Sequence, residues 1–538
     1  MSVRGFLRRL WRPTLFQGIA FVSIAGYFLL LYVVPPIRFY NIFWLQNFDY
    51  GILYNSSQML AHLQAPFVTT RGTHSWADNQ DYFQVLLGIF HHLPYPHYSL
   101  LVSHALAIFA CGVFCFLFLR REGLVSLLLP LVVWMSPYLV NMNLDLFHTE
   151  AYATILLLLM FYGATHGRPW CFATATLLAL ACKEDVAITV GTFMTLALLR
   201  PGFFQLQRRY LVAGLAASVL VFVINQGVVL PYFKLRTCEW LNADFSRSNM
   251  RAGPTAPWFA DIWSQLLNPS YYKIKFASPD VARYLLTLLW PMVFFARSTF
   301  PISLLPLPAA FINIIGSGYL IQSGYHYDHS TYAAVIIVML LGIRRVRFKK
   351  TLGTVLVLIA ACINLRTPLV RVKVTAVRTP EFWSLKKDER TRFVERLNEL
   401  LPPDIVISAD YTALNYLLRG RDTVYMFENP FRPDYFGIYG LCDGVVGVYR
   451  TVPTPDIAVV RGDYTMAPKV REILDTAYEN WTVYPFGGRH PMNLFINPRS
   501  KQYGRLVSVA RELGADEGTH LGERRGHRQA SRDLDPHP

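Results

Sequence analysis

The chain has 538 residues, of which 53% are apolar, 14% aromatic and only 16% charged, and its mean hydropathy is +0.29. Because a soluble protein of this length carries roughly a quarter charged residues, this composition excludes an ordinary soluble enzyme and indicates a polytopic membrane protein. The net charge of +16 comes from short basic loops between apolar runs, with no nucleic-acid recognition motif, which argues against nucleic-acid binding.

The first apolar run, at about residues 15–35, follows several basic residues, as in a signal peptide. It is longer than the apolar core of a signal peptide, and no small-residue cleavage site follows it. We therefore expect a retained first membrane span with its N-terminus in the cytoplasm.

Further apolar runs predict a helical bundle in the membrane. They lie at about 99–119, 124–140, 150–165, 210–231, 300–321 and 352–365, with shorter runs at 284–296 and 331–343. Residues 170–199 have basic residues at both ends and Lys183-Glu184-Asp185 in the middle. This pattern predicts two short helices that meet at the charged triplet. The total is about eleven membrane segments, and every short basic loop then falls on the cytoplasmic side.

The composition changes to that of a soluble domain at about residue 374. Strand-like segments in PPDIVISAD, RDTVYMF, PDIAVV, WTVYPF and MNLFIN alternate with helix-like YTALNYLL and APKVREILDTAYEN. This predicts a small extracytoplasmic α/β domain over residues 374–500, after a membrane domain over residues 1–366 that includes an outer loop at 36–98. The charged residues 501–538 predict a disordered tail.

Four polar clusters interrupt the apolar sequence, and the predicted topology puts all of them on the outer side of the membrane. They are NFDYG around Asp49, DLFHTE with Asp145, His148 and Glu150, the Lys183-Glu184-Asp185 triplet, and YHYDH at residues 325–329. Ionisable residues gathered at one face of a membrane bundle usually serve chemistry or transport. The sequence therefore predicts a functional site there.

Each cluster also has a structural interpretation, and the residues alone leave both open. Asp49 is either a general base or a helix N-cap or turn former. Glu150 either belongs to a site or complements a helix N-terminus capped by Thr149. Lys183 either binds a lipid phosphate as a point charge or neutralises an acid of its own triplet.

The remaining candidates lie in outer loops. Tyr325 and His326 are either site residues or members of an aromatic belt, and Arg236 can contact an anionic head group. Asp78 and Asp81 are candidates to bind a divalent cation together with Asp49, or they are solvated loop residues.

Taken in order, these stretches resemble the predicted membrane proteins of domain-of-unknown-function family 2079. The family's Y/F-D-L-G-I-F, F-H-P-E-A and K-E-D stretches are similar to residues 48–53, 147–151 and 183–185. Its Y-H-Y-S and L-P-P-D stretches are similar to residues 325–328 and 401–404. The resemblance covers about residues 15–500. This chain departs from it at Asp78-Asn79, where the family often has Asp-His, and at Thr149, where it has proline; we interpret the second as a capping change.

The layout is similar to that of the type C glycosyltransferases, multispanning enzymes that take sugars from polyprenyl-phosphate carriers and have an acid in the first outer loop. The resemblance implies that Asp49 deprotonates the acceptor and that Lys183 with an outer-loop arginine holds the carrier phosphate. His148 and Glu150 would orient the acceptor or a divalent cation. The expected catalytic residues are thus Asp49, His148 and Glu150, and the expected substrate-binding residues are Lys183, Glu184, Asp185, Tyr325, His326 and Arg236.

The expected function is sugar transfer to an envelope glycan, lipid or protein at the outer face of a bacterial plasma membrane. The expected partners are membrane lipid, a polyprenyl-phosphate-linked sugar and the envelope acceptor. One alternative is a transporter or flippase, which needs polar residues through both halves of the bilayer. Another is a non-catalytic membrane scaffold whose outer domain binds a partner.

Overall fold

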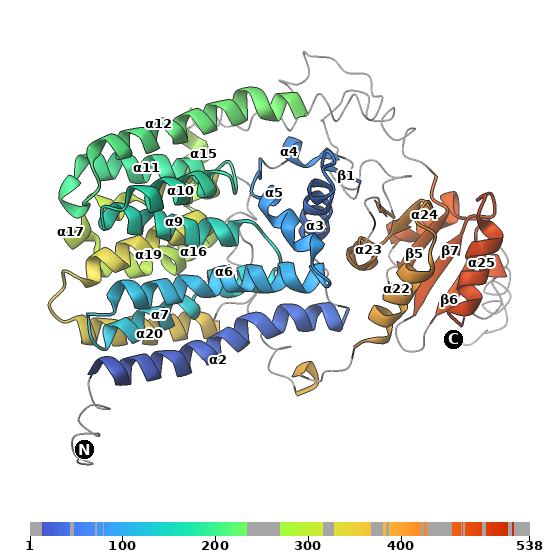
Figure 1. Ribbon diagram of the computed structural model, residues 1–538, viewed down its shortest axis with the longest axis horizontal. Coiled ribbons are helices and arrows are strands. Elements are labelled where there is room, and N and C mark those ends of the chain that lie inside the picture. The colour runs from blue at the N-terminus through green and yellow to red at the C-terminus, as the bar shows by residue number, and fades with distance from the viewer. Residues whose placement is uncertain are drawn as a thin grey trace. The chain divides into compact units, whose positions relative to one another are not determined.

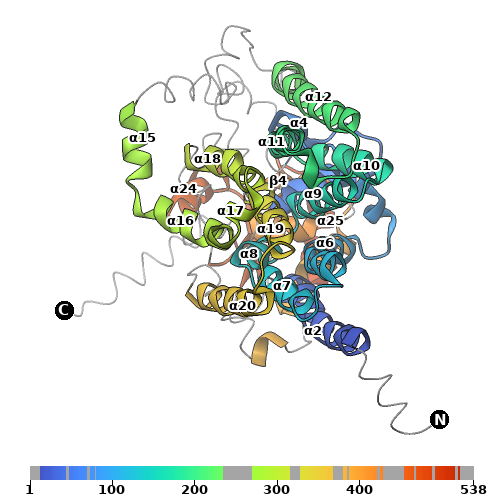
Figure 2. The same ribbon diagram turned by 90° about the vertical axis from the view of Figure 1, so that its left-hand side faces the viewer.

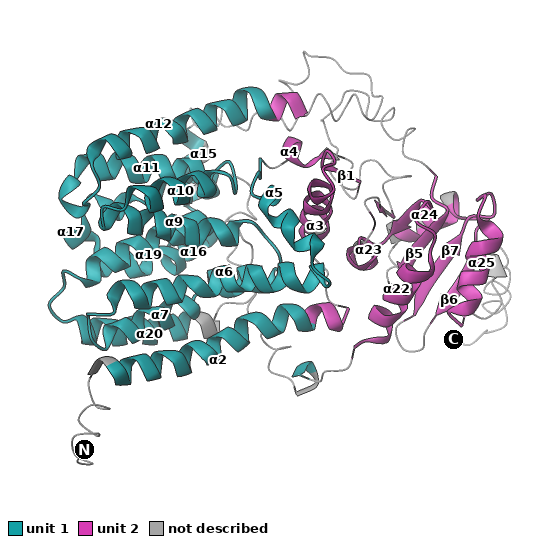
Figure 3. Cartoon of the chain, in the orientation of Figure 1, with its two compact units in different colours: residues 1–38, 79–229, 259–384 teal, residues 39–78, 230–258, 385–538 magenta. Residues whose placement is uncertain are grey.

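The structure is a computed structural model that describes the chain except for residues 1–12, 44–47, 70–72, 79, 234–268, 316–327, 367–379, 384–386, 420, 422–423, 428–453, 464, 466–467, 487–490, 515–518 and 521–538. The chain divides into two compact units (Figure 3). The first, which we call the helical unit, comprises Met1–Arg38, Asn79–Val229 and Phe259–Ser384. The second, the sheet unit, comprises Phe39–Asp78, Leu230–Trp258 and Leu385–Pro538.

Within the described residues, three helices are long and apolar enough to cross a membrane, at Leu15–Asn41, Pro96–Leu119 and Arg208–Phe233. The pair α7 (Val125–Trp134) and α8 (Pro137–Leu144), bent by 48°, adds a fourth if it is one span. The bend falls at Pro137, whose ring disfavours helical backbone at the preceding residue. Five apolar helices are shorter, at Glu150–Thr165, Pro169–Leu180, Val186–Leu199, Ile302–Ile315 and His329–Ile343.

The expected total of eleven membrane segments remains a prediction, because several of the apolar helices are shorter than a full membrane span. Helix α9 (Glu150–Thr165) has 16 residues, so it is about 24 Å long, whereas the hydrocarbon core of a bilayer is about 30 Å thick. Length alone therefore does not identify these helices as spans. In the end-on view they nevertheless lie beside the long helices of the same unit (Figure 2).

The helical unit also contains the 18-residue helix α20 (Lys349–Arg366). Its shorter helices are α5 (Gln84–Leu87), α15 (Pro269–Phe276), α16 (Pro279–Leu289), α17 (Ala296–Thr299) and α18 (Leu307–Ile315), with 3₁₀ helices at Gly88–His92, Pro201–Phe203, Trp290–Phe294, Ile302–Leu304 and Pro380–Trp383. Four longer helices of this unit are α2 (Pro13–Asn41), α6 (Pro96–Leu119), α12 (Arg208–Ile224) and α19 (His329–Ile343). Helix α12 continues as a π-helix at Asn225–Val229.

The hairpin predicted around the charged triplet is present as α10 (Pro169–Leu180) and α11 (Val186–Leu199) (Figure 1). The amides of Gln205 and Leu206, which follow α11, donate hydrogen bonds to the carbonyl of Ala164, 3.0 and 3.1 Å away. Ala164 lies at the end of α9 after which α10 begins, so α10 and α11 run antiparallel. The triplet therefore lies at the opposite end of the hairpin, as predicted.

Helices α9 and α10 approach each other closely at Gly163. A Cβ atom at this position would lie 2.5 Å from the backbone nitrogen of Phe172 and 2.8 Å from its Cα. Small residues allow such contacts between helix backbones in membrane proteins. The close packing of α9 against α10 thus depends on the glycine at position 163.

The basic loops gather at the end of the helical unit that lies away from the triplet. Lys349 donates to Glu122 with an Nζ–Oε2 distance of 2.6 Å, and Arg344 donates to the carbonyl of Phe118 at 3.0 Å. Arg345 donates to the carbonyl of Ser298 at 3.2 Å and stacks over the ring of Phe203. The loops that the charge pattern placed together on the cytoplasmic side are therefore in mutual contact.

The sheet unit contains a six-stranded mixed sheet in the order β4-β3-β5-β7-β6-β8. Its strands are β3 (Ile407–Ala409), β4 (Tyr425–Met426), β5 (Ile457–Arg461), β6 (Thr482–Phe486), β7 (Met492–Ile496) and β8 (Thr519–His520). Strand β3 is parallel to β4 and β5, and the other pairs are antiparallel. The helices are α22 (Glu389–Leu400), α23 (Tyr411–Leu417), α24 (Pro468–Ala477) and α25 (Tyr503–Glu512). Each predicted strand and helix of this region is present.

The first outer loop packs with this sheet, which the sequence did not predict. It contains α3 (Phe48–Ala61), β1 (Phe67–Val68), β2 (Thr73–His74) and α4 (Ser75–Asp78). Thr69 and Val424 exchange two hydrogen bonds of 3.0 and 3.1 Å. A Cβ atom on Gly51 would lie 2.4 Å from Oδ1 of Asn415 in α23, so a larger residue at this position would require the Asn415 side chain to shift.

The tail predicted to be disordered from residue 501 begins with ordered elements instead. Leu506, Val509 and Ala510 of α25 are buried, and β8 pairs with β6. Their i, i+3, i+4 spacing is that of a helix with one apolar face, and the surrounding charged residues obscured it in the sequence.

A candidate active site in the helical unit

A buried polar network lies at the end of the helical unit that holds the charged triplet. It begins where α9 begins: the hydroxyl of Thr149 donates to Oδ2 of Asp81, 2.5 Å away, and Gln84 Nε2 donates to the same oxygen at 3.0 Å. Asp81 is only 2% exposed. Burial raises the pKa of this loop carboxyl to about 8, although the two hydrogen bonds act in the opposite direction, so it is protonated near neutral pH.

These contacts correct two structural interpretations. The side chain of Thr149 makes no capping hydrogen bond to α9 and binds Asp81 instead. Asp81 is not a solvated loop residue, because it is only 2% exposed. Among the described residues no three His, Cys, Asp or Glu side chains are grouped so that they could hold a metal ion, but the side chain of Asp78 lies outside those residues, so a cation site with Asp78 and Asp81 stays a prediction.

The central contact of the network is an ion pair between Lys183 and Glu150. Lys183 Nζ lies 2.6 Å from Glu150 Oε1, and the two side chains are 12% and 6% exposed. The structural alternative, in which Lys183 neutralises an acid of its own triplet, is wrong, because Lys183 reaches across to the first turn of α9. Glu150 in that position also complements the positive end of the helix dipole.

His148 extends the network towards α8. Its Nε2 atom lies 3.4 Å from Asp145 Oδ2, and its Nδ1 atom lies 4.0 Å from Glu150 Oε2. Between Asp145 and His148, Leu146 has a φ of 74°. Such backbone is uncommon for a residue other than glycine, and strained residues of this kind cluster at functional sites. The turn therefore holds both titratable side chains in one fixed arrangement.

The other acids of the triplet face different neighbours. Glu184 is half-buried, and desolvation of its carboxyl raises its pKa to about 7. Its Oε2 atom is buried and has no hydrogen-bond partner among the described residues. Asp185 Oδ2 lies 3.6 Å from His329 Nε2 and accepts a hydrogen bond from Ser330 at 3.5 Å. The triplet thus connects α9 to the start of α19.

Asp328 forms a second buried cluster beside His329, and the sequence did not identify it as a site residue. Its Oδ1 atom accepts hydrogen bonds from the hydroxyl of Tyr284 at 2.6 Å and from Asn313 at 3.1 Å. Burial raises the pKa of this carboxyl, which precedes α19, to about 7. Only its place in YHYDH pointed to it, because Tyr284 and Asn313 come from helices remote in sequence.

The structure thus brings together five of the predicted site residues, namely His148, Glu150, Lys183, Glu184 and Asp185. Asp49 lies in the first turn of α3 in the sheet unit and is half-buried. Asp78 is the last residue of α4. The side chain of Asp78 and the residues Arg236, Tyr325 and His326 lie outside the described part of the chain.

The arrangement of helices is shared with a solved membrane protein. ArnT from Cupriavidus metallidurans in the apo state matches 92% of this chain and 98% of its own, with a TM-score of 0.51 and 11% identity. The same protein bound to undecaprenyl phosphate matches with a TM-score of 0.49 and 10% identity, over 90% and 98% of the two chains. The first of these matches shows that the chain shares its fold with ArnT.

The family follows from the sequence. Residues 44–430 match the family described as "Predicted membrane protein (DUF2079)", so the chain belongs to that family, as the motifs predicted. No curated protein sequence matches the chain significantly.

Proposed function

We propose that this protein is a glycosyltransferase of the membrane that takes a sugar from a polyprenyl-phosphate carrier at the outer face of a bacterial plasma membrane. The observation that supports this most directly is the buried network around the Lys183–Glu150 pair, at the end of the helical unit remote from the basic loops. The fold shared with ArnT supports the same class. A transporter would instead need polar residues through both halves of the bilayer.

The reaction would be a single displacement. An acceptor hydroxyl attacks the anomeric carbon of the sugar, and Asp49 takes the hydroxyl proton as general base. The bond between the anomeric carbon and the phosphate oxygen breaks as the new bond to the acceptor oxygen forms. The carrier phosphate leaves with the electron pair, and positive charge beside it lowers the barrier.

Lys183 is the residue that we assign to the phosphate. An ammonium group has three N–H donors, so Lys183 can contact Glu150 and a phosphate oxygen at the same time. Glu150 holds the ammonium in a fixed place and maintains its charge, because the carboxylate lies 2.6 Å away. His148, 4.0 Å from Glu150, is assigned to orientation of the acceptor.

The test uses purified full-length protein in bilayers of bacterial lipid, with undecaprenyl-phosphate-linked, radiolabelled pentoses and hexoses as probes. The measurement is release of label from the carrier in the presence of an envelope extract as acceptor. Asp49→Asn should reduce release at least a hundredfold. Asp463→Asn is the matched control, because Asp463 lies in the sheet unit, as Asp49 does, and its side chain is 70% exposed. This variant should release label at the rate of the unmodified protein. Full activity of Asp49→Asn would refute its role as base, and no release from any probe by the unmodified protein would refute the function.

A further inference from the structure

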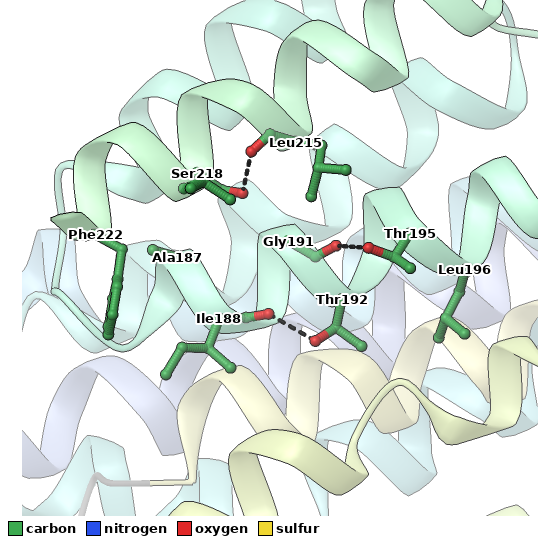
Figure 4. A pocket seen from close by; sticks show the side chains of 10 residues that line it. Ala187, Ile188, Gly191, Thr192, Thr195, Leu196, Leu215, Ser218 and Phe222 are labelled. Atoms are coloured by element: carbon green, nitrogen blue, oxygen red, sulfur yellow. Dashed lines mark hydrogen bonds between the residues drawn. The ribbon is translucent and has the colours of Figure 1, made fainter. Parts of the chain in front are cut away.

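The groove between α11 and α12 shows how the sides of the helical unit are suited to lipid (Figure 4). In its wall, the hydroxyl of Thr192 donates to the carbonyl of Ile188 at 2.8 Å. The hydroxyl of Ser218 donates to the carbonyl of Leu215, also at 2.8 Å. Hydroxyl groups that are bonded within their own helix can face hydrocarbon without leaving a donor unpaired. The lateral surface at this groove is therefore effectively apolar.

A second exposed apolar surface lies in the segment that precedes α6. We call it the apolar strip, and it consists of Val85, Leu86, Ile89 and Leu93, which are 53%, 51%, 67% and 46% exposed. The first two belong to α5, and Ile89 belongs to the 3₁₀ helix Gly88–His92. Because residues three and four apart on a helix are neighbours on one face, Val85 and Leu86 lie beside Ile89. An exposed apolar face of this kind marks contact with a membrane or a partner.

The inward side of the same segment is fixed to the helical unit. Gln84 is fully buried, and its Nε2 atom donates to Asp81 Oδ2 at 3.0 Å. The backbone amide of Phe83 donates to the carbonyl of Ala181, 2.8 Å away. A helix on the surface of a soluble protein turns its apolar side chains to the core and its polar side chains to water. In α5 this order is reversed at Gln84, so the outward face of the segment is suited to an apolar environment.

The strip lies at the end of α6 that is remote from the basic loops. The other end of α6 is at Leu119, where the carbonyl of Phe118 accepts the hydrogen bond from Arg344. Helix α6 begins at Pro96, three residues after Leu93, and the 3₁₀ helix of the strip packs against it (Figure 1). Because α6 is long and apolar enough to cross a membrane, its two ends lie where the hydrocarbon core meets the head groups. The strip is therefore at a membrane surface, on the side of the buried network.

We propose that the apolar strip is an interfacial anchor that lies in the lipid leaflet on the network side of the membrane, at the boundary between acyl chains and head groups. Apolar faces of this kind are buried about 5–10 Å into that boundary. Tyr95, which follows the strip, is 63% exposed, and its ring centroid lies 6.2 Å from that of Tyr98. Tyrosines collect at this level, where the ring contacts lipid and the hydroxyl reaches water. The inference goes beyond the proposed function and does not depend on it.

A strip at this depth also fixes the depth of the buried network. Gln84 and Thr149 donate to the same oxygen of Asp81, and Thr149 directly precedes α9. The next residue, Glu150, is paired with Lys183. The network is thus joined to the strip through three side chains, and the Lys183 ammonium group lies at the level of the lipid phosphates.

Spin labels on single cysteines test the strip. Full-length protein without its native cysteines carries Ile89→Cys and is placed in bilayers of bacterial lipid. Leu63→Cys is the matched control, because Leu63 is an apolar residue of the sheet unit that is 96% exposed. Electron paramagnetic resonance then compares collisions of the label with oxygen, which concentrates in hydrocarbon, and with a water-soluble nickel complex. At Ile89 we expect more collisions with oxygen than with the nickel complex, and at Leu63 we expect the reverse.

Two results would overturn the inference. If the nickel complex reaches Ile89 as readily as Leu63, the strip faces water. If neither reagent reaches Ile89, protein covers the strip, for example a second copy of the chain. Leu86→Cys replaces Ile89→Cys if that variant is not monodisperse. The measurement needs no substrate, so the anchor can fail while sugar transfer is confirmed, and it can be confirmed in a protein that transfers no sugar.

Discussion

Burial of the Lys183–Glu150 pair determines how much stability the protein loses when one of the two residues is replaced. A buried ion pair is weak evidence for stability by itself, but removal of one partner leaves an uncompensated buried charge, which costs about 3–5 kcal/mol. Glu150 is only 6% exposed at its side chain. The pair is therefore a point at which the site and the stability of the helical unit are coupled.

We predict that Lys183→Met lowers the free energy of unfolding by about 3–5 kcal/mol, measured by thermal or denaturant unfolding in detergent. The double variant with Glu150→Gln should recover most of that loss, because the unpaired charge is then gone. Lys349→Met is the control: the Lys349–Glu122 pair has the same 2.6 Å distance, but its side chains are 28% and 23% exposed. Partly solvated pairs of this kind contribute roughly 1 kcal/mol or less. Equal losses for the two lysines would contradict the argument.

Asp81 makes stability depend on pH. Its pKa of about 8 in the folded state is well above the ordinary value of 3.8. Between about pH 4 and pH 8 the folded protein therefore keeps a proton that the unfolded chain releases. The stability associated with this proton is present in full below pH 4 and is lost as the pH rises to 8, with a slope of up to about 1.4 kcal/mol per pH unit.

Asp81→Asn should remove this contribution. An amide has nearly the shape of a protonated carboxyl and can still accept the hydrogen bond from Thr149. Relative to the unmodified protein, we expect the melting temperature of the variant to rise more at pH 8 than at pH 5. Glu184 and Asp328, whose pKa values are raised to about 7, remain in both proteins, so the test is the difference between the two pH profiles. Parallel profiles would show that Asp81 is ionised in the folded state.

At the scale of elements, the sequence predicted those helices and strands that apolar periodicity or the distribution of charge determines. The charge at Lys183 and the basic residues at both ends of the segment predicted the α10–α11 hairpin, and alternating apolar patterns predicted β5, β6 and β7. The Thr149–Asp81 contact was not predicted, because it joins residues 68 positions apart and each has an ordinary local interpretation. The packing of the first outer loop on the sheet was missed for the same reason.

The α9–α10 pair provides a prediction at this scale. Gly163→Ala places a methyl group 2.5 Å from the backbone of Phe172, which cannot move as a side-chain tip can. We expect a loss of about 1–3 kcal/mol from overpacking, seen as a lower melting temperature in detergent. Gly26→Ala in α2 is the control, since no atom lies within 4 Å of its added Cβ, and the higher helix propensity of alanine should make it neutral or slightly stabilising. If Gly163→Ala leaves the melting temperature unchanged, α9 and α10 can move apart at this contact without a loss of stability.

At the scale of the whole molecule, the distribution of charge along the helical unit predicts which end faces the cytoplasm. Loops rich in Arg and Lys stay on the cytoplasmic side, and in this unit they interlock at one end through Lys349, Arg344 and Arg345. The buried network lies at the other end. Sugar transfer at the outer face requires that the network end is the extracytoplasmic one.

Labelling of single cysteines tests this orientation. Phe348 is 78% exposed beside the basic loops, and Tyr95 is 63% exposed just before α6 at the other end. In spheroplasts, a membrane-impermeant maleimide should label Tyr95→Cys at once and Phe348→Cys only after permeabilisation, each in a background where the native cysteines are replaced by serine or alanine. The reversed pattern would place the Lys183–Glu150 network in the cytoplasm. An enzyme so oriented would take its carrier from the inner leaflet, and the acceptor would then be a cytoplasmic molecule instead of an envelope component.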